Sequence, residues 1–199
     1  IMSVTLAAGA RRLAGRGVIV RTLDAIENLG GMTVFCTDKT GTLTEGQVRL
    51  DATLAPDGAP SAEVAELAWL NAHLETGIEN PLDKAIVDAL GASRAHLTGP
   101  VKVDEIPYDF RRKRLTIVAR RAGDAEAVLI TKGAFDNVVA TCATWRTPAG
   151  ETRLDAGARE QLSAEFRRHC AAGFRVLAIA EKRVSLAPHY SIGDETDLC

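Results

Sequence analysis

A carboxylate follows directly on a short apolar run near the start of this 199-residue chain. The run covers residues 32–36 and leads through Thr37 into DKTGTLT at positions 38–44. A carboxylate at the carboxyl end of a strand is exposed and can attack phosphorus, which gives an aspartyl phosphate and divides one difficult transfer into two easier steps. Lys39 and the amides and hydroxyls of the loop could bind the phosphoryl oxygens, with a magnesium ion spreading the charge. The residue types alone also allow an ordinary strand followed by a capped turn.

Two common phosphate-binding loops are missing from the sequence. Neither G-x-x-x-x-G-K-[ST] nor G-x-G-x-x-G occurs, although these loops cradle phosphates in many nucleotide-binding proteins. Any nucleotide must therefore be held in another way.

The elements that would position these residues form a mixed pattern. Strands are predicted at 101–106, 115–120, 126–131 and 174–182, with turns at Gly123 and at residues 148–150 that make hairpins. Helices are predicted at 4–15 and 61–74, and two more begin at the capping residues Asn80 and Asp155. Residues 51–61 are expected to be a loop. The pattern predicts an α+β fold, an antiparallel twisted sheet flanked by helices, and not a βαβ array.

Composition excludes several classes of protein. The chain is 46% hydrophobic and 25% charged, with a net charge of −2, so no electrostatic field would gather nucleic acid, and we expect no nucleic-acid partner. The four cysteines form no C-x-x-C pair and are expected to be reduced thiols. No apolar run approaches the roughly 18 residues of a membrane span. Residues 1–10 are apolar enough to be the cut end of one, which predicts a fragment of a larger protein.

The sequence DKTGTLT resembles the phosphorylation signature of the P-type ATPases. The resemblance implies that Asp38 is the phosphorylated nucleophile, with Lys39 and Thr40 as catalytic neighbours. It also implies that Asp38 and Thr40 bind magnesium together with residues that would lie downstream of this chain. Related phosphatases of the haloacid-dehalogenase superfamily use a second aspartate as acid and base two residues after the nucleophile, where this sequence has Thr40. Loss of that base is expected to slow hydrolysis of the phosphoenzyme, as suits a pump.

The resemblance covers nearly the whole chain and implies a division into segments. Residues 1–17 are similar to the cytosolic stalk end of a membrane helix, and residues 18–47 to the first segment, with its first strand, of the haloacid-dehalogenase-like phosphorylation domain. Residues 48–190 resemble the inserted nucleotide-binding domain, and residues 191–199 the start of the return to the phosphorylation domain. The implied partners are ATP and the rest of the same pump, namely its membrane, actuator and phosphorylation domains.

Two stretches of the predicted nucleotide-binding domain resemble segments that contact ATP in the family. TKGA at 131–134 is similar to the KGA motif, which implies nucleotide contacts from Lys132 and Gly133. IPYDF at 106–110 is similar to the segment whose aromatic residue stacks on adenine, and position implies Tyr108 in this role. Phe110 is the alternative, although a place in the core is expected for it.

Further polar residues of the predicted pocket follow from the same resemblance. Lys113, five residues after Tyr108, is implied to lie near the nucleotide, and Arg175 in GFRVLA to reach its phosphates. Asp83 is implied to face the adenine, although a carboxylate in the first turn of a helix equally fits there. The neighbouring residues Arg111, Arg112 and Arg114 are expected to form a solvated basic cluster.

The most similar group within the family is suggested by LETGIENPLDKA at 74–85 and DEIPYDFRRKR at 104–114. These stretches resemble the bacterial magnesium-transporting P-type ATPases. The implied function is ATP binding, with ATP and Mg²⁺ as cofactors, by a soluble fragment of a cation pump on the cytoplasmic face of the bacterial inner membrane. The alternatives are a calcium or proton pump, a soluble phosphohydrolase of the haloacid-dehalogenase type, and a module that only binds nucleotide.

Overall fold

The computed structural model describes residues 2–77, 80–94, 99–121 and 123–199. The chain forms two compact units, Ile1–Gln47 and Val48–Cys199. The division falls where the sequence analysis begins the nucleotide-binding domain, and the assignment of each segment to a part of a pump stays a prediction.

The first unit contains helices α1 (Met2–Ala14) and α2 (Asp24–Gly30) and the five-residue turn η1 (Lys39–Leu43), in which Thr40 and Gly41 do not have helical dihedral angles. The strand expected at residues 32–36 is absent, so this prediction is wrong. Val34 and Phe35 are 76% and 71% exposed. A strand needs a neighbour for its backbone N–H and C=O groups and a buried face, and no segment of the described chain pairs with residues 32–36.

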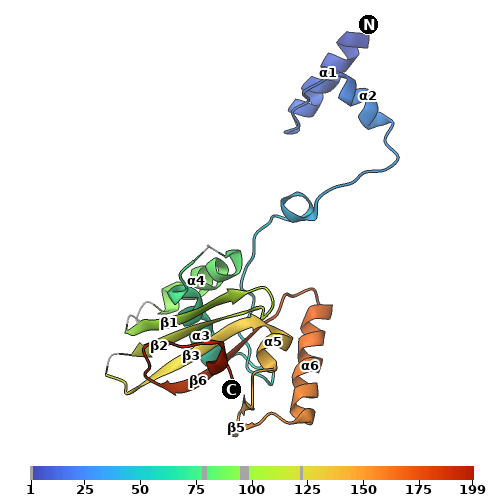
Figure 1. The fold of residues 1–199 in the computed structure, drawn as a ribbon. Helices are drawn as coiled ribbons and strands as arrows, with labels where there is room; N and C mark the ends of the chain where they lie inside the picture. Colours follow the sequence, from blue (N-terminus) through green and yellow to red (C-terminus); the bar gives the residue numbers. More distant parts are fainter. Residues whose placement is uncertain (1, 78–79, 95–98, 122) are drawn as a thin grey trace. The chain divides into compact units, whose positions relative to one another are not determined.

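The second unit is built on a four-stranded antiparallel sheet with the order β1-β2-β3-β6 (Figure 1). Its strands are β1 (Pro100–Asp109), β2 (Arg114–Arg121), β3 (Glu126–Ala134) and β6 (Leu177–Ser185). A separate hairpin joins β4 (Thr144–Thr147) and β5 (Gly150–Arg153). The antiparallel sheet predicted from the sequence is therefore confirmed.

Helices cover both faces of this sheet. On one face Trp69 and Leu70 of α3 (Ala62–Leu74) pack against Ile130 of β3. On the other, Val138 of α5 (Phe135–Val139) joins a larger apolar cluster that includes Leu198. Residues 191–199 thus contribute to the packing of the second unit, and their predicted return to a phosphorylation domain stays a prediction.

The two remaining helices begin where their capping residues predict. The side chain of Asn80 accepts a hydrogen bond of 3.0 Å from the backbone N–H of Leu82, at the start of α4 (Pro81–Arg94). The side chain of Asp155 accepts one of 2.9 Å from Ala158 at the start of α6 (Ala156–Ala171). Such caps satisfy N–H groups that have no partner within the helix. The cap on α4 places Asp83 in the first turn of that helix.

Candidate functional site

Most of the residues predicted to bind nucleotide lie at one end of the sheet. Tyr108 is near the end of β1, Lys113 directly precedes β2, and Lys132 is near the end of β3. Arg175 lies two residues before β6, whose first residue, Leu177, pairs with Ala134. Because neighbouring strands are antiparallel, the end of one lies beside the start of the next. The topology therefore places these residues, which come from positions up to 67 residues apart (175 − 108), at the same end of the sheet, with Tyr108 on one edge strand and Arg175 just before the other.

Lys132 is buried and bound by acidic side chains from two other segments. Its ammonium group donates a hydrogen bond to the carboxylate of Asp83, and it lies 3.8 Å from Oε2 of Glu75. Burial first, and then the adjacent Asp83, raise the pKa of Glu75 from 4.5 to about 7, while Lys132 opposes the shift. The charge of Lys132 is thus largely compensated by Asp83.

Glu75 belongs to this site and was not foreseen from the sequence. It directly follows the last residue of α3. At that position an acidic side chain is repelled by the partial negative charge of the helix C-terminus. This mismatch was the one local signal available. Residues 78 and 79 of the stretch that suggested the magnesium-transporting group lie outside the described residues.

The two candidate aromatic residues are both accessible. Tyr108 is 50% exposed and Phe110 is 86% exposed. Their rings meet edge to face with centroids 5.5 Å apart, an arrangement that aromatic pairs favour. The core position expected for Phe110 is therefore wrong, because this residue lies in the turn after β1 and not within the strand.

Gly133 has a steric role at the same end of the sheet. A Cβ atom added there would lie 2.4 Å from the carbonyl oxygen of Lys113 and 2.6 Å from Cα of Arg114. Both are backbone atoms of the adjoining segment, so neither can rotate away. Glycine therefore allows β3 to approach the start of β2, where the backbone N–H of Ala134 donates a 2.9 Å hydrogen bond to Lys113.

The predicted solvated cluster of arginines is wrong for two of its three members. Arg112 and Arg114 have side chains that are only 12% and 13% exposed, and both bind the carboxylate of Glu195, which is fully buried. Glu195 follows Arg112 by 83 residues, so local sequence could not reveal this partner. Arg111 alone is exposed as expected.

A cavity of about 700 Å³ opens beside Lys132 and Arg175. Its walls are mainly apolar and include Leu82, Phe174 and Leu177. Arg175 is exposed and forms no ion pair within the described residues, so its charge is available to an anion. Tyr108 and Lys113 lie at the same end of the sheet but do not line this cavity.

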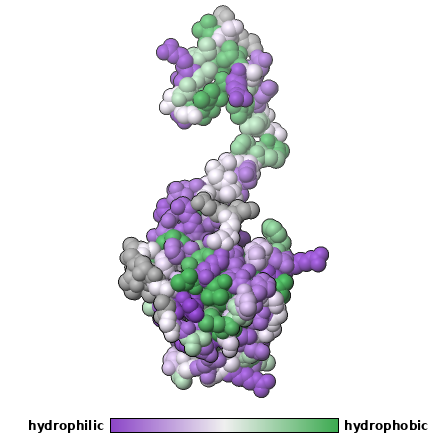
Figure 2. All heavy atoms as spheres, turned by 60° about the vertical axis from the view of Figure 1, so that its left-hand side comes forward, coloured by the Kyte–Doolittle hydropathy of each residue, from purple (hydrophilic) through white to green (hydrophobic). Residues whose placement is uncertain are grey.

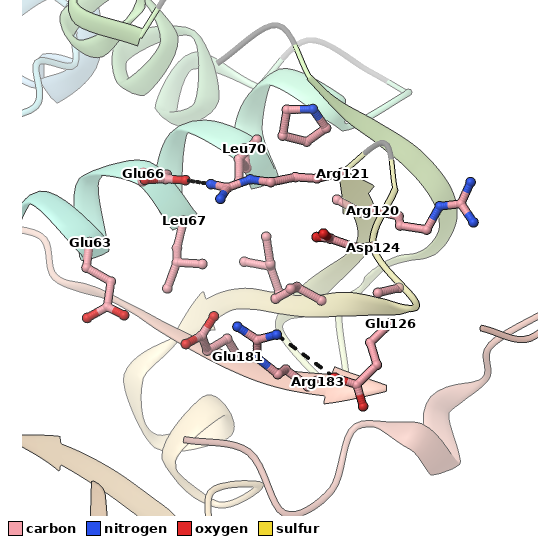
Figure 3. Close-up of a pocket in the computed structure, with 15 residues that line it drawn as sticks. Glu63, Glu66, Leu67, Leu70, Arg120, Arg121, Asp124, Glu126, Glu181 and Arg183 are labelled. Carbon is pink, nitrogen blue, oxygen red and sulfur yellow. Dashed lines mark hydrogen bonds and ion pairs between the residues drawn. The ribbon is translucent and has the colours of Figure 1, made fainter. Parts of the chain in front are cut away.

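A second cavity of about 290 Å³ lies between α3 and the sheet (Figure 3). Leu67 and Leu70 point from the helix toward the strands, and charged side chains surround them. Arg121 binds Glu66, and Arg183 lies 3.9 Å from Glu126. Five acidic residues line this cavity against three arginines, namely Glu63, Glu66, Asp124, Glu126 and Glu181 against Arg120, Arg121 and Arg183. Glu63 and Glu181 also pair with Arg146, so the cavity has no excess of positive charge to favour a phosphate-bearing ligand.

The predicted phosphorylation loop lies in the first unit, where Asp38 is exposed. Its carboxylate accepts a 2.7 Å hydrogen bond from the backbone N–H of Lys39, and the chain then turns at Gly41, whose φ is +78°. The carboxylate of Asp38 and the oxygens of Thr40 are hard donors of the kind that Mg²⁺ takes. Within the described residues no three His, Cys, Asp or Glu side chains gather as a metal site. These donors thus fit magnesium in kind but form only part of a site.

Comparison with known protein families identifies the second unit. Residues 63–198 match the family model described as "P-type ATPase, cytoplasmic domain N". The chain belongs to the P-type ATPase family. The resemblance noted from DKTGTLT and the predicted α+β fold, an antiparallel sheet flanked by helices, are therefore confirmed.

Some relatives of this P-type ATPase chain carry names that specify an ion. The chain is 37% identical over its whole length to "Magnesium-transporting ATPase, P-type 1" of Salmonella typhimurium and 35% identical to the protein of that name from Escherichia coli K12. It is 29% identical over 92% of its length to the "Plasma membrane ATPase" of Kluyveromyces lactis. It spans about a fifth of these relatives, 22%, 22% and 20% of their lengths. Among the described residues, no helix has the length and apolar character required to cross a bilayer.

Proposed function

We propose that this chain is the ATP-binding part of a magnesium-transporting P-type pump, together with the loop that is phosphorylated. The names of the relatives that match the whole chain support magnesium over the calcium and proton alternatives. The remaining parts of the proposed pump are its membrane, actuator and phosphorylation domains. On this proposal the chain works at the cytoplasmic face of a bacterial inner membrane.

One observation carries the ATP-binding part of the proposal, namely that Tyr108 and the three cations Lys113, Lys132 and Arg175 all lie at the same end of the sheet. Exposed Tyr108 offers a ring for stacking the adenine. Lys132, whose charge Asp83 compensates, suits contacts with the base. Lys113 and Arg175 are exposed and suit the phosphates. Because neither of the two common phosphate-cradling loops occurs in the sequence, we expect weak binding with the phosphates largely in solvent.

In the proposed reaction, a carboxylate oxygen of Asp38 attacks the γ-phosphorus of ATP. An O–P bond forms as the bond to the β–γ bridging oxygen breaks, and ADP leaves with that electron pair. A bound Mg²⁺, held by Asp38 and Thr40 with residues outside this chain, would neutralise charge on the phosphoryl oxygens. Thr40 cannot act as a general base for water, which favours a lasting aspartyl phosphate over the hydrolysis expected of a soluble phosphohydrolase.

The proposed ATP site is tested by titrating ATP into the chain while recording backbone amide chemical shifts. We expect the shifts to change around residues 108, 132 and 175. Changes confined to residues 41–44 that spare those three positions would contradict the proposed pocket.

A further inference from the structure

Glu195 is a fully buried carboxylate with a complete set of partners. Nη1 of Arg112 donates to both of its oxygens, at 2.7 and 2.8 Å, and Nε of Arg114 donates at 2.8 Å. The hydroxyl of Thr116 donates a further hydrogen bond of 2.7 Å. A buried charge needs such pairing to offset its loss of water. Glu195 therefore fixes the guanidinium groups of both arginines.

The two arginines use their remaining donors differently. Nη2 of Arg112 donates a 2.6 Å hydrogen bond to the carbonyl of Pro107, and its Nε lies 3.5 Å from the carboxylate of Asp109. Nη1 of Arg114 instead donates to the carbonyl of Asn137 in α5, at 3.1 Å. Arg112 thus contacts the residues on both sides of Tyr108, whereas Arg114 contacts a different element.

The backbone around Tyr108 is irregular and gains from such support. The pairing of β1 with β2 shifts between Ile106 and Asp109, so Pro107 and Tyr108 fall outside the regular ladder. Lys113, at the end of the turn, has a φ of +51°, which is uncommon for a residue with a side chain. A segment without regular pairing loses conformational freedom when a ligand orders it, and prior ordering reduces that cost.

We propose that Arg112, held by Glu195, is a positioning residue that orders the segment carrying Tyr108 before ATP binds. This inference rests on the proposed role of Tyr108 as the ring that stacks on adenine. Arg112 touches no nucleotide itself. It acts through its hydrogen bond to Pro107 and its ion pair with Asp109.

The matched variants Arg112→Lys and Arg114→Lys test this role. The two arginines are similarly buried and both pair with Glu195, so we expect similar losses in melting temperature. Arg112→Lys should raise the dissociation constant for ATP roughly tenfold. Arg114→Lys should leave it within about twofold of the parent chain, because the segment around Tyr108 keeps its support.

Coupling to Tyr108 separates positioning from general destabilisation. In a Tyr108→Ala background, Arg112→Lys should not weaken ATP binding further, because the side chain that it positions is gone. Equal effects of the two arginine variants on affinity, or an undiminished effect of Arg112→Lys in that background, would overturn the inference. Unchanged ATP affinity in Tyr108→Ala alone would instead contradict the proposed function.

A second route is available if Arg112→Lys does not fold. Asp109→Asn removes the ion pair of Arg112 beside Tyr108 at a carboxylate whose side chain is 39% exposed. It must then weaken ATP binding more than Arg114→Lys does, and an unchanged affinity would again overturn the inference.

Discussion

At the scale of single residues, the ammonium group of Lys132 has two neighbouring carboxyl groups with different properties. Asp83 forms a direct hydrogen bond with the ammonium group, whereas Glu75 lies 3.8 Å away. Burial raises the pKa of Glu75 to about 7. The cluster therefore gains negative charge as the pH rises through about 7.

This arrangement predicts a pH-dependent effect of Glu75→Gln on stability. The pKa of Glu75 is raised on folding from an ordinary value of 4.5 to about 7. The protonated carboxyl thus supports the folded state fully below pH 4.5, and this contribution is lost as the pH rises through about 7. Relative to the parent chain, Glu75→Gln should gain about 1 kcal/mol in free energy of unfolding between pH 5 and pH 8, with allowance for solvent screening.

Urea denaturation at the two pH values measures this difference. Glu160→Gln, which replaces a carboxyl exposed on α6, is the control and should show no comparable gain. Parallel pH profiles for Glu75→Gln and the parent chain would contradict the prediction.

Tyr108→Ala should weaken ATP binding more than Phe110→Ala. Loss of a stacked ring costs on the order of 1–3 kcal/mol in nucleic-acid platforms, and a similar loss is expected here. Since both side chains are exposed, both variants should keep melting temperatures close to that of the parent chain. Calorimetric titration with ATP and thermal melting provide the two measurements, and a larger loss of affinity in Phe110→Ala would reverse the assignment.

At the scale of elements, the close approach of β3 to the start of β2 depends on one glycine. A methyl group at position 133 would overlap backbone atoms of Lys113 and Arg114. Gly133→Ala must therefore push these segments apart at the end of the sheet where the candidate site lies. We expect a loss of about 1–3 kcal/mol in free energy of unfolding, as for other overpacked positions.

Chemical denaturation checks this prediction, with Gly77→Ala as the matched control. A Cβ atom at Gly77 meets no atom within 4 Å, so that variant should be nearly neutral. Equal stability of the two variants would contradict the prediction, because it would show that the end of the sheet accommodates the extra methyl group.

At the scale of the whole molecule, we expect this chain to bind ATP without turning it over. The apolar residues before Asp38 are exposed and form no strand pairing within the described chain. Figure 2 shows hydrophobic residues, in green, at the molecular surface. Phosphoryl transfer depends mainly on positioning and electrostatic stabilisation, so a nucleophile without a fixed frame loses nearly all of its rate. Assays of phosphate release should find no turnover that depends on Asp38, and steady release that is lost in Asp38→Asn would contradict this expectation.

Local sequence was sufficient for the features that short-range chemistry determines. The caps at Asn80 and Asp155, the four strands of the sheet, and the DKTGTLT loop could all be read from neighbouring residues. The family resemblance named Lys132 and Asp83, and the structure brings these two together. The roles of Asp38, Tyr108 and Arg175 in catalysis and binding stay predictions, although their positions are now described.

Tertiary structure decided what depends on residues far apart in the chain. The burial of Arg112 requires Glu195, which lies 83 residues away. The raised pKa of Glu75 comes first from its burial and then from the nearby Asp83 of α4, against the opposing effect of Lys132. The expected strand at 32–36 failed because its hydrogen-bonding partners must come from elsewhere, and none lies in the described chain. Propensity and motif act over a few residues, whereas burial, pairing and electrostatics are set by whichever segments the fold brings into contact.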